Sequence, residues 1–362
     1  MRDDLDPADY LGRHWKTGGS GIQQAVDHLV ELSAGNSQNA ELYREMLLDV
    51  VRMAQADRNR WDAKIMLQTI RELEQAFARL ELFKRRRKVT VFGSARTPVN
   101  AAIYSLAREM GRELSSHDYM VITGAGGGIM AAAHEGAGLD NSLGFNITLP
   151  FEQQANPVVK GTDHDISFRF FFLRKLFFIK EADALILCPG GFGTLDETLE
   201  VLTLIQTGKS PVVPVVLLEE PGGRYWESLL AFFREQLGDP GYILQSDFNL
   251  MTVAHTPEEA MQEVLGFYSN YDSARWVDGR YILRMKRPLT EQALAHLNEH
   301  FTPLCLSDSF TQHPGREVRA DEPELDDMHC LAFVFNGRDH GLLRALINVI
   351  NQAENQQNPG TA

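Results

Sequence analysis

The sequence predicts an α/β fold, a Rossmann-like doubly wound parallel sheet, and two observations support this class. Short runs of apolar and β-branched residues alternate with helical segments along the middle of the chain. Several of these runs end directly in glycine-rich turns, as strands do before a helix in such sheets. Helical patterns before this region and mixed patterns after it predict an N-terminal helical extension and a small C-terminal α+β unit.

Length, charge and cysteine content indicate the number of domains, the kinds of partner and the compartment to expect. At 362 residues the chain exceeds one ordinary core, so several domains are expected. Acidic residues outnumber basic ones by 49 to 35, which disfavours binding to nucleic acid or to an anionic membrane. The three cysteines have no metal-site spacing and, with no secretory pattern at the N-terminus, they favour a cytoplasmic protein.

Residues 1–88 are predicted to form an N-terminal arm and a helical extension. Apolar residues recur at helical spacing over 22–33 and over 40–82, which indicates two or three helices packed on the main domain or on a partner subunit. The run 84–88 contains only lysine and arginine. It is either an anion-binding patch or the cationic C-terminal end of a helix, and the overall acidity favours the second interpretation.

Residues 89–268 are predicted to be a nucleotide-binding catalytic domain. Its expected strands are 89–92, 119–122, 145–149, 184–188 and 212–218. Glycine-bearing loops follow three of these strands, at Gly93, at 124–128 and at 190–193. Because ligands bind outside the carboxyl ends of parallel strands, we expect the three loops to converge on one edge of the sheet.

The segment 188–197, Cys-Pro-Gly-Gly-Phe-Gly-Thr-Leu-Asp-Glu, is the most informative stretch. A buried strand precedes it, and a helix is predicted over 195–206. Glycines and a helix N-terminus form a cradle for phosphate, and the hydroxyl of Thr194 adds a hydrogen bond. Asp196 and Glu197 are either charges that complement the helix dipole or functional groups. The functional interpretation is favoured, because a carboxylate beside a phosphate repels it.

Other common nucleotide motifs do not occur. Neither the dinucleotide pattern G-x-G-x-x-G with its acidic partner nor the Walker pattern G-x-x-x-x-G-K-[ST] is found, so a Walker-type ATPase is disfavoured. The apolar stretch 168–178 contains Arg174 and Lys175, and cations in such a stretch need a carboxylate or phosphate partner. Asp196 and Glu197 are the expected partners.

Taken together, these segments resemble the LOG ("Lonely Guy") family of nucleoside 5′-monophosphate phosphoribohydrolases, long mislabelled as lysine decarboxylases. The resemblance is carried by the segments 93–96, 123–130, 146–150, 172–175, 189–197 and 206–209, and above all by P-G-G-x-G-T-x-x-E ending in Glu197. It covers residues 89–268. Phe-Phe-x-Arg-Lys at 171–175 is similar to the long-form branch, whereas Ala125 and Ala131 depart from the family pattern.

The resemblance implies hydrolysis of the N-glycosidic bond of nucleoside 5′-monophosphates, giving free base and ribose 5-phosphate. It implies Arg174 and Glu197 as catalytic residues, with Arg174 positioning Glu197. The implied substrate-binding residues are Gly93, Ser94, Gly126, Gly127, Gly128, Met130, Lys175, Gly190, Gly191, Gly193, Thr194 and Asp196. No metal or other cofactor is expected. The protein is expected to form a homodimer or a higher homo-oligomer. The base preference, whether cytokinin-type or general, is not specified by these residues.

Residues 275–362 are predicted to form a small α+β domain, which we interpret as ferredoxin-like. Its expected strands are 281–285, 303–306 and 331–335, and its expected helices are 290–301 and 341–351. The segment 266–279 is interpreted as a polar join, and 321–327 as a solvated acidic loop. This unit is expected to cover the active site, build the oligomer or bind a regulator.

A binding protein is the alternative from another class. The same cradle would serve a non-catalytic nucleotide sensor or a carrier of a phosphorylated cofactor such as molybdopterin. The pair Arg174 and Glu197 favours the enzyme, since binding alone does not require it. A lysine decarboxylase is disfavoured because no pyridoxal-type lysine motif is evident.

Overall fold

The computed structural model describes residues 20–57, 59–148, 154–315 and 327–357. The chain divides into two units, Met1–Leu73 and Glu74–Ala362. Residues 149–150 of one predicted motif, and all of the acidic stretch 321–327 except Asp327, lie outside the described residues.

The described part of the first unit is helical. Helix α2 spans Ser20–Ala34, α3 spans Ala40–Ala56, and α4 spans Arg60–Leu80, whose last turns belong to the second unit. Val26 and Val30 of α2 pack against Leu48 of α3. Asp57 caps α3 in the left-handed conformation, which ends the helix and divides the predicted region 40–82 in two.

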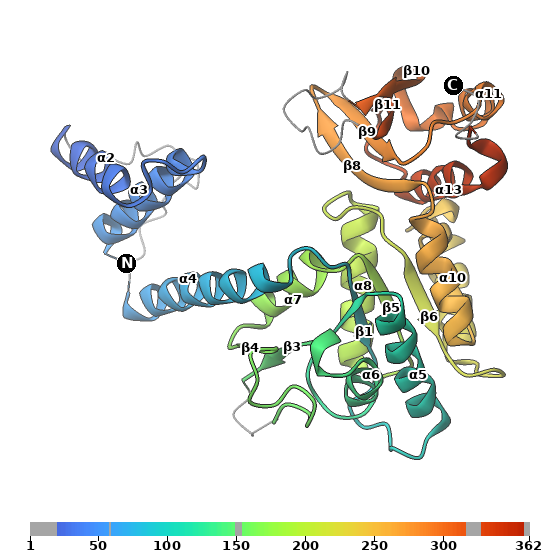
Figure 1. Ribbon diagram of the computed structural model, residues 1–362, viewed down its shortest axis with the longest axis horizontal. Helices are drawn as coiled ribbons and strands as arrows, with labels where there is room; N and C mark the ends of the chain where they lie inside the picture. The colour runs from blue at the N-terminus through green and yellow to red at the C-terminus, as the bar shows by residue number, and fades with distance from the viewer. Residues whose placement is uncertain (1–19, 58, 149–153, 316–326, 358–362) are drawn as a thin grey trace. The chain divides into compact units, whose positions relative to one another are not determined.

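The second unit contains a seven-stranded parallel sheet in the order β4-β3-β2-β1-β5-β6-β7 (Figure 1). Its strands are β1 Lys88–Phe92, β2 Met120–Thr123, β3 Ser142–Ile147, β4 Asp165–Phe168, β5 Ala184–Leu187, β6 Val215–Leu218 and β7 Met251–Ala254. Its main helices are α5 Ala102–Ser116, α6 Ile129–Ala137, α7 Phe171–Lys180, α8 Phe192–Gln206, α9 Tyr225–Phe233 and α10 Pro257–Phe267. The predicted Rossmann-like class is confirmed.

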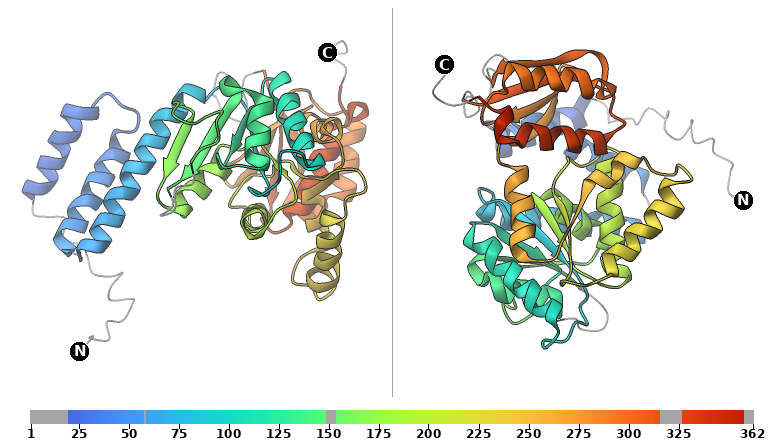
Figure 2. Two further views of the ribbon diagram at one scale, coloured as in Figure 1. Left: turned by 90° about the horizontal axis from the view of Figure 1, so that it is seen from below. Right: turned by 90° about the vertical axis from the view of Figure 1, so that its right-hand side faces the viewer.

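Helices cover both faces of this sheet, as Figure 2 shows from two further sides. On one face, buried residues of α5, α6 and α10 pack against alternate residues of the central strands, including Val89 and Val91 of β1. On the other face, α7 packs its aromatic side chains on the sheet: Phe178 contacts Phe92 and Phe145. Burial on both faces explains why the central strands are continuous apolar runs.

The two edge strands, β4 and β7, were not predicted. In β4 only Ile166 and Phe168 are buried, and in β7 only Ala254 is. An edge strand with one partly open face lacks the continuous apolar run that marks the central strands, although β2, β5 and β6 are no longer than β4 and β7.

A four-stranded antiparallel sheet follows, in the order β10-β11-β9-β8. Its elements in chain order are β8 Tyr271–Val277, β9 Arg280–Met285, α11 Glu291–His300, β10 Cys305–Pro314, β11 His329–Phe335 and α13 His340–Asn351. The predicted small α+β unit is thus present, but the interpretation of 266–279 as a join is wrong, because β8 occupies half of it. The ferredoxin-like assignment and the domain limits stay predictions.

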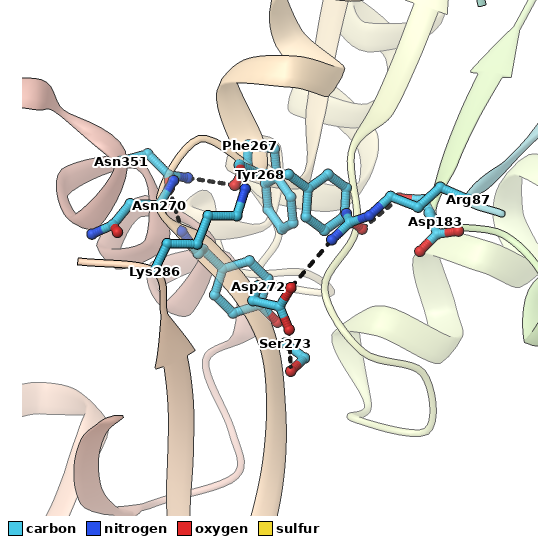
Figure 3. A network of polar contacts seen from close by, with 10 residues as sticks. Arg87, Asp183, Phe267, Tyr268, Asn270, Asp272, Ser273, Lys286 and Asn351 are labelled. Atoms are coloured by element: carbon cyan, nitrogen blue, oxygen red, sulfur yellow. Dashed lines mark hydrogen bonds and ion pairs between the residues drawn. The ribbon is translucent and has the colours of Figure 1, made fainter. Parts of the chain in front are cut away.

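A polar network joins the two sheets of this unit (Figure 3). The side chain of Asn351 accepts hydrogen bonds from the backbone of Asn270 and Tyr271, and it donates one to Phe267. The guanidinium of Arg87 lies 3.7 Å from the ring centre of Tyr268. The Tyr268 hydroxyl donates to the carbonyl of Asp183 at 2.7 Å. The antiparallel sheet is thereby attached where β1 and β5 begin.

Across the described segments, no helix combines the length and apolar character needed to cross a membrane.

Candidate active site

A cavity of about 820 Å³ lies at the carboxyl ends of the central strands. The loops after β1, β2 and β5 meet there, as predicted from their glycines. Ten predicted residues line it: Gly93, Ser94, Met130, Arg174, Gly190, Gly191, Gly193, Thr194, Asp196 and Glu197. Four others, Gly126, Gly127, Gly128 and Lys175, are not among the lining residues.

The cradle is built by the turn between β5 and α8. Gly191 is the N-cap of α8. The backbone N–H groups of the first turn have no acceptor within the helix, and they are directed toward its N-terminus, which faces the cavity. A Cβ on Gly190 would lie 2.1 Å from the Thr194 hydroxyl oxygen and 3.0 Å from the Ser94 nitrogen. Ser94 also donates its backbone N–H to Pro189 at 3.2 Å. Only glycine at position 190 therefore lets the loops after β1 and β5 touch.

The second glycine turn supports the first rather than lining the cavity. Gly128 has a φ of +60°, and a Cβ there would lie 2.2 Å from the Ser94 carbonyl oxygen. Gly127 lies against Ala95, and the Gly126 carbonyl accepts a hydrogen bond from Asn156. The structure thus gives these glycines a packing role, and their predicted contact with substrate stays a prediction.

Arg174 extends from α7 into the cavity wall. Its Nε donates to the Phe145 carbonyl at 2.8 Å, and its Nη2 lies 3.4 Å from the Gly124 carbonyl oxygen. Burial lowers the pKa of Arg174 to about 10, and the negative charge of Glu197 opposes this effect. The guanidinium therefore stays protonated at neutral pH and brings a fixed positive charge to the site.

Gly124 makes room for this guanidinium, which leads to a testable prediction. A Cβ at position 124 would lie 2.1 Å from Arg174 Nη2. Because the obstructed atom is the end of a long side chain, Gly124→Ala should displace the guanidinium at little cost in stability. We expect kcat/KM to fall about 10²-fold, as misplaced catalytic groups do. A melting temperature more than a few degrees lower would instead show that the loop itself had collapsed.

Glu197 is a buried carboxylate whose ion pair comes from Lys175. The Lys175 Nζ lies 3.3 Å from Glu197, 2.9 Å from Asp196 and 2.5 Å from Glu200. The prediction that Lys175 needs carboxylate partners is confirmed, whereas Arg174 donates to backbone carbonyls instead. Burial raises the pKa of Glu197, and the charge of Lys175 opposes that shift. Lys175 thus both holds Glu197 in place and favours its ionised form.

Removing Lys175 should shift the pH dependence of any reaction that needs ionised Glu197. In Lys175→Met the stabilising cation is lost, so the pKa of Glu197 rises further. Activity that disappears as the pH falls through this pKa will then disappear at a higher pH, and the acid limb of the kcat/KM profile moves upward. The control is Lys180→Met, which removes another cation of α7, one that pairs with Glu181. It should leave the acid limb of the profile in place. An unmoved limb in Lys175→Met would contradict the assignment.

Tyr225 lines the cavity and was not predicted. It begins α9, and its hydroxyl donates to the Gly190 carbonyl at 2.8 Å, which fixes the cradle from the side of β6. Phe171 and Phe192 also line the cavity, and 94% of Phe192 is exposed. The available signal was positional, since Tyr225 follows a predicted strand at the edge where ligands bind.

Comparison with known proteins bears on the same region. Residues 127–264 match the family model described as "Possible lysine decarboxylase". The chain is 27% identical over 228 residues to a probable cytokinin riboside 5′-monophosphate phosphoribohydrolase, LOGL2 of Oryza sativa subsp. japonica, covering 56% of this chain and 89% of that protein. It is 28% identical over 183 residues to LOG3 of Arabidopsis thaliana, covering 49% and 81%. The resemblance to the LOG family is confirmed.

Solved structures were compared as well. The structural-genomics target TM1055 is 27% identical, with a TM-score of 0.35, and the match covers 49% of this chain and 96% of that one. The molybdenum cofactor binding protein from Rippkaea orientalis is 20% identical, with a TM-score of 0.36, and the match covers 49% and 94%.

One departure from the LOG pattern has a visible structural consequence. Ala125, which stands in place of a glycine, is fully buried at a φ of 60°. That conformation costs a non-glycine residue about 1–2 kcal/mol. The methyl group packs with Ala155 and Val159, which offsets part of this cost. Assignment to the long-form branch stays a prediction.

Proposed function

We propose that this protein hydrolyses the N-glycosidic bond of nucleoside 5′-monophosphates, releasing free base and ribose 5-phosphate. One observation carries the proposal. A buried carboxylate, Glu197, lies in the second turn of the helix whose N-terminus forms the cradle, and both line the same cavity. The LOG relatives, named as phosphoribohydrolases of a nucleotide, support the same class of reaction.

In the proposed reaction the cradle binds the 5′-phosphate and thereby fixes the ribose. Amide groups at the start of α8 and the Thr194 hydroxyl donate to the phosphate oxygens. Glu197, deprotonated and held by Lys175, orients a water molecule toward C1′ and stabilises positive charge on the sugar.

Bond changes follow from this arrangement. The water oxygen forms a bond to C1′ as the C1′–N bond breaks. The electron pair of the breaking C1′–N bond passes to the base nitrogen. Glu197 accepts the proton that the water loses, and a proton is returned to the departing base. The positive charge of Arg174 stabilises negative charge that develops on that base. Chemistry of this kind commonly depends on carboxylates.

The substrate class is tested by comparing each nucleotide with its nucleoside. AMP, GMP, CMP and UMP are incubated with the protein beside adenosine, guanosine, cytidine and uridine, and free base is quantified by chromatography. We expect base from at least one monophosphate and a much lower rate from its nucleoside, because only the monophosphate engages the cradle. Equal rates for both would contradict the role of the cradle. Tight binding with the nucleotide recovered whole would support the non-catalytic alternative.

A further inference from the structure

A second pocket, of about 310 Å³, lies at the opposite edge of the central sheet from the candidate active site. The segments 84–88 and 180–183 line it. The first segment leads into β1 and the second into β5, so the pocket lies where these two strands begin. The candidate active site lies where the same strands end. The two cavities are therefore separate.

The lining of this pocket is strongly cationic. It contains six lysines and arginines, Lys84, Arg85, Arg86, Arg87, Lys88 and Lys180, against two carboxylates, Glu181 and Asp183. Glu181 pairs with both Lys88, at 3.3 Å, and Lys180, at 2.5 Å. Three more of the cations pair with carboxylates outside the lining: Lys84 with Glu81 at 3.2 Å, Arg86 with Asp118 at 3.0 Å and Arg87 with Asp272 at 3.4 Å. The side chains of Glu81 and Asp118 are mostly exposed, so water screens these two pairs and the lining keeps its excess of cations. Such an excess is unusual in a chain whose net charge is −14. It is the lining expected for an anion site.

Two buried donors of the pocket residues lack partners. Within the described residues, Arg86 Nε and Arg87 Nη1 are shielded from solvent and have no hydrogen-bond acceptor. Leaving a buried donor unsatisfied is unfavourable, and more so when the group is charged, so an acceptor that reached these nitrogens would stabilise them. The other terminal nitrogen of Arg87, Nη2, lies 3.4 Å from Asp272, a long contact that a stronger acceptor can replace while the guanidinium stays on the Tyr268 ring (Figure 3).

We propose that this pocket binds a small oligophosphate anion. Several adjacent cations match several phosphoryl oxygens, and arginines provide forked donors for them. A nucleic-acid strand fits less well. Glu181 and Asp183 interrupt the cationic surface, and a pocket of this volume holds one compact anion rather than a repeating backbone.

Inorganic pyrophosphate is the probe, titrated into the full-length protein by calorimetry. The test variant combines three substitutions, Lys84→Gln, Arg85→Gln and Lys180→Gln. The fold should tolerate them, because 73% of the Lys84 side chain and 47% of the Lys180 side chain are exposed. The charge-matched control is Lys160→Gln with Lys209→Gln and Arg224→Gln, none of which lines this pocket. The cradle of the candidate active site is also expected to bind phosphate. The variant Gly190→Ala, which disturbs the cradle, distinguishes binding at the pocket from binding at the cradle.

We expect saturable binding that persists in the control and in Gly190→Ala. In the pocket variant the affinity should fall at least about tenfold, which corresponds to about 1.4 kcal/mol. Asp272→Asn should tighten binding several-fold, because it removes the carboxylate that competes for Arg87. These readouts do not depend on catalysis, so a failed hydrolysis assay leaves them unaffected.

Three results would overturn the proposal. The first is the absence of pyrophosphate binding to the wild-type protein. The second is equal weakening in the pocket variant and in its charge-matched control, which would indicate only a general effect of charge. The third is binding of a single-stranded oligonucleotide that the pocket variant loses while pyrophosphate does not bind, which would assign the surface to nucleic acid.

Discussion

Glu197→Gln should lower kcat for hydrolysis of a nucleoside 5′-monophosphate by about 10²–10⁴-fold, the usual contribution of a general base. The substitution keeps the size of the side chain and removes the charge that activates water. The carboxylate is buried in the wall of the cavity, and burial raises its pKa. The cradle is unchanged, and the variant should still bind the nucleotide with an affinity within a few-fold of KM.

Steady-state kinetics and calorimetry with AMP test this pair of expectations. Glu227→Gln, a change of the same kind at an exposed position on α9, is the matched control and should retain activity. A melting curve for each variant separates loss of chemistry from loss of fold. Release of base at the wild-type rate by Glu197→Gln would remove the residue from the mechanism.

Gly190→Ala should cause the second large loss, through phosphate binding rather than chemistry. The added Cβ would lie 2.1 Å from the Thr194 hydroxyl oxygen, so Thr194 or the turn must move. We expect kcat/KM for the 5′-monophosphate to fall by about 10²-fold or more, as misplacement of a positioning group does. Activity on the nucleoside, which has no phosphate to place, should change far less.

The ratio of kcat/KM for AMP to that for adenosine is therefore the informative quantity. It should decrease sharply in Gly190→Ala. Gly266→Ala is the control, because a Cβ there meets no atom within 4 Å and the position lies on α10. If Gly190→Ala lowered both substrates' kcat/KM equally, the glycine would be structural and the cradle would not be the phosphate site.

Sequence patterns predicted the central part of the fold because its physical causes are local. β1 and β5 are buried on both faces, so their composition alone marks them as strands. Strand, glycine turn and helix follow one another in the chain, and parallel strands bring the loops after β1, β2 and β5 to one edge. The position of Glu197 beside the cradle follows from the same local order.

Features that depend on side-chain direction could not be predicted. Arg174 and Lys175 are neighbours in sequence but point about 100° apart on a helix. Spacing could not show that Lys175 would contact Glu197 while Arg174 bonded to backbone carbonyls. Likewise, Gly128 is a glycine because the Ser94 carbonyl lies against it, a contact between loops distant in sequence.

Weakly patterned elements were missed for a related reason. β8, Tyr271–Val277, alternates polar and apolar residues irregularly, and its place is fixed by pairing with β9 and by the Asn270 and Asn351 network. Tyr225 belongs to the site only because α9 begins beside Gly190.

A product balance tests the central claim most directly. The wild-type protein is incubated with AMP, and adenine, ribose 5-phosphate, adenosine, inorganic phosphate and remaining AMP are all quantified over time. GMP, CMP and UMP are incubated in parallel, and the corresponding products are quantified. For each nucleotide that is a substrate, such as AMP, the account predicts equal molar amounts of free base and ribose 5-phosphate. It predicts that neither the nucleoside nor inorganic phosphate is formed. Adenosine with inorganic phosphate, or all four nucleotides bound yet recovered whole, would contradict it.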